Sequence, residues 1–169
     1  MKKVYDTINQ YCVEHELLTN GDGIVIGLSG GMDSVCLLQV LAALRNEWQL
    51  RLVCVHVHHG IRGTAADEDA AFAQRLAAKY NISFRLYEMD IPQLAKEQGL
   101  SEEEAGRNYR YRCFEEVRKE LNFDKIAVAH HRDDQAETVL WQSLRGSGLR
   151  GVCGMRAGRA NIVSGSTAD

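Results

Sequence analysis

A glycine-rich turn is the segment of the sequence best suited to bind phosphate. Residues 29–34 read Ser-Gly-Gly-Met-Asp-Ser, after the apolar run 24–28 and before an apolar run at helical spacing. Glycines let backbone N–H groups approach a ligand closely, and the N-terminus of the following helix favours an anion. The two serines add hydroxyl donors. The turn therefore predicts a phosphate site formed by Ser29, Gly30, Gly31, Met32, Asp33 and Ser34.

The carboxylate of Asp33 is out of place in a simple phosphate site, because it repels the anion. A divalent cation that bridges Asp33 to phosphate oxygens would explain it, since Mg²⁺ prefers such ligands. The turn has neither the Gly-Lys-Ser/Thr ending of a Walker A loop nor the G-x-G-x-x-G spacing of a dinucleotide site. The simpler alternative is a capped strand-to-helix turn without a ligand, which does not account for the whole set of residue types.

A second chemically rich segment follows the apolar run 124–129. His130, Asp134 and Glu137 stand at positions i, i+4 and i+7, so a helix would carry an imidazole and two carboxylates on one face. Such a face can bind Mg²⁺ through its carboxylates and keep a histidine near the reaction. The alternative is a solvated acidic helix start, because Asp favours the first turn of a helix. That alternative does not require Glu137 on the same face.

Three histidines lie at the end of the apolar run 50–57 and just beyond it. On a strand, His56 and His58 share one face and His59 lies on the other. No further Cys or His at suitable spacing completes a zinc site. The histidines are interpreted as lining a nucleotide cleft, with His58 as a candidate cofactor contact. A structural, hydrogen-bonded role is the alternative for His56, the most interior of the three.

Two arginines and a tyrosine share one face of a predicted helix over residues 101–121. Arg107, Arg110 and Tyr111 stand at i, i+3 and i+4. A fork of guanidinium groups can hold phosphates bidentately. The alternative is an exposed helix face with an ion pair between Glu103 and Arg107, and spacing alone favours that alternative.

Strand and helix patterns alternate along the chain and position these segments. Short apolar runs predict strands, and apolar residues at helical spacing predict helices. The predicted strands are 24–28, 50–57, 82–87 and 124–129, and the predicted helices are 4–15, 35–41, 65–79, 92–99, 101–121 and 133–144. This alternation predicts an α/β fold, a parallel sheet with helices on both faces. Ligands of such sheets bind beyond the carboxyl ends of the strands, where the candidate residues lie.

The composition is that of an ordinary globular protein. The 169 residues are 45% apolar and carry a formal net charge of −3, which argues against a general DNA-binding domain. Four arginines after Glu137 make the C-terminal end basic, either to meet phosphates or as solvated surface. Five cysteines without a C-x-x-C pair, and no apolar targeting or membrane segment, predict a reduced, cytoplasmic protein with no membrane contact.

Five motifs, in order, resemble those of the tRNA(Ile)-lysidine synthases, a family of N-type ATP pyrophosphatases. They are S-G-G-x-D-S at 29–34, H-V-H-H-G at 56–60, E-E-A-x-R-x-x-R-Y at 103–111, A-H-H-x-D-D-Q-x-E-T at 129–138, and R-G-S-G-L-R-G-x-x-G-M at 145–155. The resemblance implies an adenine-nucleotide alpha-hydrolase-like, Rossmann-like fold over residues 1–163. It also implies that ATP activates the wobble cytidine of tRNA(Ile) with a CAU anticodon, and that L-lysine then displaces AMP.

The resemblance assigns roles to individual residues as well. Asp33, Asp134 and Glu137 are implied to handle Mg²⁺ and phosphates, and His130 and Arg110 to contact the reacting nucleotides. Together these five are the candidate catalytic residues, and Arg107 and His58 join the glycine turn as candidate ATP contacts. A homodimer is one candidate assembly.

The sequence departs from the resembled family in its length and its final segment. Those proteins run to several hundred residues, and residues 164–169 here do not match and are predicted to be a disordered tail. The chain is therefore interpreted as a truncated catalytic domain, and one alternative is an ATP-binding fragment without catalysis. A tRNA thiolase of the same superfamily is another, although those enzymes typically need cysteine pairs. A nucleotide-binding sensor is a third, although it would lose the Asp134 and Glu137 pair.

Overall fold

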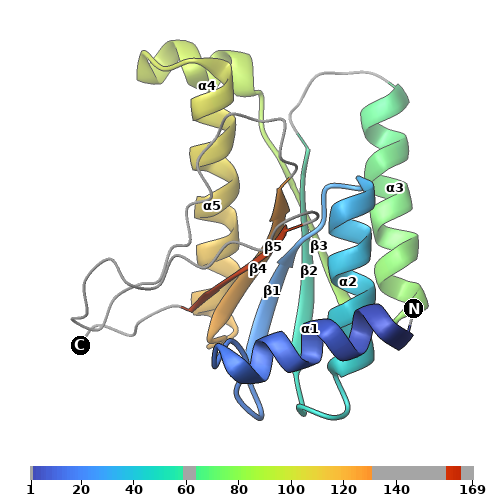
Figure 1. The fold of residues 1–169 in the computed structure, drawn as a ribbon. Coiled ribbons are helices and arrows are strands. Elements are labelled where there is room, and N and C mark those ends of the chain that lie inside the picture. Colours follow the sequence, from blue (N-terminus) through green and yellow to red (C-terminus); the bar gives the residue numbers. More distant parts are fainter. Residues whose placement is uncertain (1, 59–63, 131–158, 165–169) are drawn as a thin grey trace, which may run out of the picture.

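The protein folds around a single five-stranded sheet. The structure, a computed structural model, describes residues 2–58, 64–130 and 159–164 (Figure 1). The strands lie in the order β3-β2-β1-β4-β5. Four of them pair in parallel, and β5 pairs antiparallel with β4 at one edge. The strand bounds are β1 Gly23–Gly27, β2 Arg51–His58, β3 Ser83–Glu88, β4 Lys125–His130 and β5 Arg159–Ser164.

In the described part of the chain, five helices cover the two faces of this sheet (Figure 1). One apolar cluster joins one face to α1 (Lys2–Glu14), α2 (Met32–Leu44) and α3 (Thr64–Lys79). A second cluster joins the other face to α4 (Ile91–Gln98) and α5 (Glu102–Glu120). Successive residues of β1 alternate between the clusters, since Ile24 and Ile26 belong to the first and Val25 to the second. The predicted α/β class, with a parallel sheet covered on both faces, is confirmed.

Local sequence signals define two of these helices. The side chain of Ser101 accepts a hydrogen bond from the backbone N–H of Glu104 at 3.2 Å, so Ser101 is the N-cap at which α5 begins. Asp90 caps α4 in the same way, through the N–H of Gln93 at 3.0 Å. Gly99 ends α4 in the left-handed conformation, with φ of 66°. The helix predicted over residues 133–144 lies outside the described residues.

The antiparallel strand β5 was not predicted. It pairs with the whole of β4, from Lys125 opposite Ser164 to His130 opposite Arg159. Only a short apolar stretch, Ile162 and Val163, marks it in the sequence, and the paired positions of β4 and β5 lie 29 to 39 residues apart along the chain. The predicted tail 164–169 begins at the last residue of β5, and its other residues lie outside the described part.

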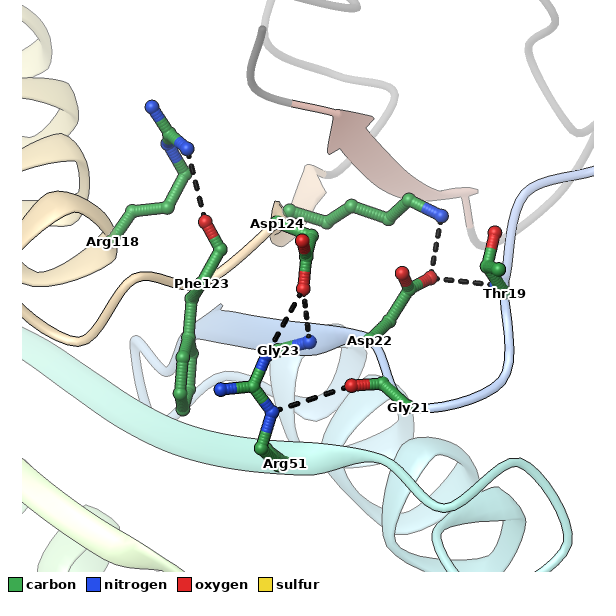
Figure 2. A network of polar contacts seen from close by, with 9 residues as sticks. Thr19, Gly21, Asp22, Gly23, Arg51, Arg118, Phe123 and Asp124 are labelled. Carbon is green, nitrogen blue, oxygen red and sulfur yellow. Dashed lines mark hydrogen bonds and ion pairs between the residues drawn. The ribbon is translucent and has the colours of Figure 1, made fainter. Parts of the chain in front are cut away.

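A polar network ties the N-terminal edge of the sheet together (Figure 2). The ammonium of Lys125 lies 2.5 Å from a carboxylate oxygen of Asp22 and donates to the carbonyl of Leu17 at 2.9 Å. Asp124 accepts from the backbone N–H of Gly23 at 2.7 Å. These contacts join the starts of β1 and β4, at the edge opposite the glycine turn.

Gly27 lets α5 lie close against the sheet. A Cβ at this position would stand 2.8 Å from Cζ of Phe114 and 2.9 Å from Cγ1 of Val128. Both atoms belong to buried side chains, so there is little room to yield. We expect Gly27→Ala to lower the free energy of unfolding by about 1–3 kcal/mol, as overpacked cores do. Urea unfolding measures this loss of stability. Gly31→Ala is the control, because a Cβ on Gly31 would lie at an ordinary 3.6 Å from Oγ of Ser29.

No helix in the described part of the chain is both long enough and apolar enough to cross a membrane.

Candidate functional site

The turn between β1 and α2 is closed by a ring of hydrogen bonds. The N–H of Gly31 donates to Oγ of Ser29 at 3.4 Å, and the Ser29 hydroxyl donates to Oγ of Ser34 at 3.1 Å. The Ser34 hydroxyl then donates to the carbonyl of Gly31 at 2.9 Å. Gly30 has a positive φ of 93°, which glycine adopts without strain. The two serines, predicted as phosphate donors, therefore also shape the turn itself.

The helix α2 begins directly after this turn, and its first residues are accessible to solvent. Gly31 is its N-cap residue and supplies no side-chain cap. The first turn contains Met32, which is 89% exposed, and Asp33, which is half-buried. Backbone N–H groups in a first helical turn have no partner within the helix, and the helix dipole adds positive potential there. The arrangement suits an anion with a cation beside it at Asp33.

The two histidines of β2 have different environments. His56 is 5% exposed, and its Nδ1 lies 2.7 Å from the carbonyl oxygen of Leu28, the residue before the turn. That contact supports the structural alternative considered for His56. Nε2 of His58 lies 3.4 Å from a carboxylate oxygen of Asp67, in the first turn of α3. His59 lies outside the described residues.

The arginines of α5 lie near the same end of the sheet. Phe114 packs at Gly27, the last residue of β1. Five residues earlier in α5, Tyr109 donates to the carbonyl of Glu88, the last residue of β3. The N-terminal part of α5 therefore extends past the carboxyl ends of these strands. Arg107 and Arg110, one to two turns before Phe114, therefore lie beyond the carboxyl ends of the strands, on the side of the turn.

Arg107 and Arg110 share a face with Tyr111, as predicted. Burial raises the pKa of the Tyr111 hydroxyl, while the positive charges of Arg107 and Arg110 act to lower it. The alternative pair, Glu103 with Arg107, is not among the ion pairs formed by described residues.

The predicted magnesium ligands are only partly described. Val128 of β4 is in register with Gly27, so His130, the last residue of β4, lies alongside the start of the turn. Asp33 is described at the turn, whereas Asp134 and Glu137 lie outside the described residues. Within the described part, no group of three or more His, Cys, Asp or Glu side chains could hold a metal ion.

Asp69 lies at the turn and was missed from the sequence. A Cβ on Gly30 would stand 3.8 Å from Cβ of Asp69, in α3. Asp69 belongs to the acidic stretch 67–69, which reads as an ordinary exposed helix face. No periodicity relates it to the turn, so only the fold, which brings α3 close to Gly30, shows this proximity.

Comparison with known proteins identifies the family. The profile described as PP-loop domain matches residues 2–166, nearly the whole chain. The chain belongs to the PP-loop domain family. The turn at residues 29–34, between β1 and the N-terminus of α2, is called the PP-loop below.

Curated relatives of this PP-loop protein share one name. A tRNA(Ile)-lysidine synthase of Caldanaerobacter subterraneus subsp. tengcongensis is 47% identical over 163 residues, which cover 96% of this chain and 34% of that protein. The enzymes of the same name from Clostridium tetani and Geobacillus kaustophilus are 41% and 37% identical, over 94% and 89% of this chain. The chain spans about a third of the length of these relatives.

Solved structures confirm the fold. The U34-tRNA thiolase NcsA from Methanococcus maripaludis superimposes with a TM-score of 0.61 at 22% identity, over 75% of this chain and 43% of that one. An NH3-dependent NAD synthetase from Campylobacter jejuni gives a TM-score of 0.54 at 19% identity, over 74% of this chain and 54% of that one. At these identities the likeness concerns the fold alone.

Proposed function

We propose that the PP-loop binds the phosphates of ATP. The observation that carries this proposal is the N-terminus of α2, which has no side-chain cap. It follows a turn in which Gly30 has a positive φ and the hydroxyls of Ser29 and Ser34 form hydrogen bonds within the turn. Backbone N–H groups there can donate to phosphate oxygens without displacing a protein acceptor. Arg107 and His58 are the further candidate ATP contacts, since both lie near the carboxyl ends of the strands.

We propose that Mg²⁺ binds in the same region, with Asp33, Asp134 and Glu137 as its protein ligands. Asp33 is partly accessible at the mouth of the PP-loop, where a bare carboxylate would repel a polyphosphate. When bound, the ion neutralises charge on the pyrophosphate portion of ATP. Arg110 adds positive charge on the α5 side, and His130 lies where β4 ends beside the PP-loop. Both are the proposed contacts to the reacting nucleotides.

The proposed reaction joins lysine to a tRNA nucleotide. The names of the relatives support it, as do the motifs at residues 103–111 and 129–138. The C2 oxygen of the wobble cytidine of tRNA(Ile), with a CAU anticodon, attacks the α-phosphorus of ATP and releases pyrophosphate. The amine of L-lysine then attacks C2 and releases AMP, which leaves lysidine. We place this reaction in the cytoplasm, with a homodimer as a candidate assembly.

Release of AMP and pyrophosphate from ATP tests the proposal. The 169-residue chain is incubated with Mg²⁺ and ATP, with lysine and tRNA(Ile) added singly and together. Product formation that requires both additions supports lysidine synthesis. Binding of ATP without turnover supports an ATP-binding fragment, since the chain spans only a third of its relatives. Absence of ATP binding would refute the proposed function of the PP-loop.

A further inference from the structure

A buried histidine on β2 holds the residue that precedes the PP-loop. Nδ1 of His56 lies 2.7 Å from the carbonyl oxygen of Leu28, and the two residues are 5% and 1% exposed. A carbonyl oxygen can only accept a hydrogen bond, so Nδ1 carries the proton in this contact. The contact joins two neighbouring strand ends through a side chain rather than through the regular ladder.

Leu28 is fixed on both sides of its backbone. Its N–H donates to the carbonyl of Val55 at 2.9 Å, and its carbonyl accepts from the ring of His56. The strand pairing of β1 with β2 ends one residue earlier, at Gly27 opposite Val55. Leu28 is therefore the last residue that β2 holds before the chain enters the PP-loop.

Fixing this carbonyl also fixes the first backbone donor of the loop. The peptide joining Leu28 to Ser29 is trans, so the N–H of Ser29 points opposite to the Leu28 carbonyl. The same residue contributes its Oγ to the hydrogen-bond ring that closes the turn. Rotation of this peptide would turn the N–H of Ser29 away from the loop and would disturb the hydrogen bonds of the Ser29 hydroxyl.

We propose that His56 is a positioning residue for phosphate binding by the PP-loop. It contacts no phosphate itself, and it acts by orienting the peptide that begins the loop. The inference rests on the proposed ATP-binding function. It assigns to the first histidine of the H-V-H-H-G motif a role distinct from that of His58, whose ring contacts Asp67 instead.

Two substitutions at this position separate the hydrogen bond from the packing. In His56→Asn the side-chain amide nitrogen can occupy the position of Nδ1 and donate to Leu28, whereas His56→Leu fills space without a donor. Leu52→Ala is the matched control, because Leu52 is buried on the same face of β2 and is remote from the loop. Binding of MgATP and of magnesium pyrophosphate is measured by calorimetry, below the melting transition of every variant.

We expect His56→Leu to weaken binding of both probes by about tenfold, the usual scale of one lost hydrogen bond. His56→Asn should recover most of this affinity, and Leu52→Ala should lower the melting temperature with unchanged affinity. Wild-type affinity in His56→Leu, or an equal loss in His56→Asn, would overturn the positioning role while leaving the proposed function intact. A wild-type chain that binds neither probe would overturn both.

Discussion

Asp33→Ala is expected to reduce the release of AMP and pyrophosphate from ATP by about a hundredfold or more. The reason is electrostatic, because a carboxylate repels a neighbouring phosphate unless a cation lies between them. Loss of one such stabilising contact in a preorganised site typically costs two to three orders of magnitude in rate. Calorimetric titration of ATP with and without Mg²⁺ gives a second measurement, in which the variant should lose the magnesium-dependent part of the affinity.

The fold should tolerate the same substitution. Asp33 is half-buried in the first turn of α2, and no hydrogen bond or ion pair of its side chain is found among the described residues. Removing an acid from a helix N-terminus costs about 0.3–1 kcal/mol. Asp33→Asn keeps the shape and removes the charge, so it should behave like the alanine variant in activity. Glu68→Gln, on the exposed face of α3, is the control for a general loss of negative charge.

A fully active Asp33→Ala protein would remove Asp33 from the proposed magnesium site. An inactive Glu68→Gln protein would show instead that the overall negative charge of this region matters, rather than the position of one carboxylate. Equal unfolding free energies of the variants and the wild type would establish that the assays compare folded proteins.

The parts of the fold that the sequence predicts are those with local causes. The strand at 24–28 is a continuous apolar run because both faces of β1 are covered, by α2 on one side and α5 on the other. The start of α5 is encoded locally by Ser101, whose side chain caps the backbone N–H of residue 104. The PP-loop can be predicted from the sequence because its glycines, serines and carboxylate are contiguous.

Features that depend on distant partners could not be predicted. β5 forms through pairing with β4 and carries little apolar signal of its own. Asp69 reaches Gly30 only because α3 packs beside the PP-loop. For Arg107, local spacing favoured a pair with Glu103, which is not among the ion pairs formed by described residues. The contact of His56 with Leu28 spans 28 residues, and the sequence suggested a structural role without indicating the partner.

Among the ion pairs of the described residues, breaking the pair of Asp22 with Lys125 is expected to cause the largest loss of unfolding free energy. The two residues are 8% and 7% exposed, and their charged groups lie 2.5 Å apart (Figure 2). The backbone N–H of Thr19 also donates to the same carboxylate at 2.6 Å. Removing one member leaves the other charge buried without its partner, which typically costs 3–5 kcal/mol. We expect this loss of unfolding free energy for Lys125→Met and for Asp22→Ala.

A double-mutant cycle and a surface control test this expectation. The double variant Asp22→Ala/Lys125→Met should lose less than the sum of the single losses, because no uncompensated charge remains. Glu120→Gln breaks an ion pair with Arg85 in which the two side chains are 55% and 35% exposed, and it should lower the free energy of unfolding far less than either buried single variant. Additive losses, or single variants as stable as wild type, would show that the pair is effectively solvated.

The position of this pair also separates stability from ligand binding. Asp22 and Lys125 join the starts of β1 and β4, whereas the PP-loop and His130 follow the opposite ends of these strands. Between the ion pair and the PP-loop, β1 pairs with β4 from Ile24 to Gly27. The backbone hydrogen bonds of this pairing do not involve the side chains of Asp22 and Lys125. Lys125→Met should therefore melt at a lower temperature yet bind MgATP with wild-type affinity while it is folded. A variant that loses affinity before it unfolds would show that the register of β4 against β1 depends on this pair.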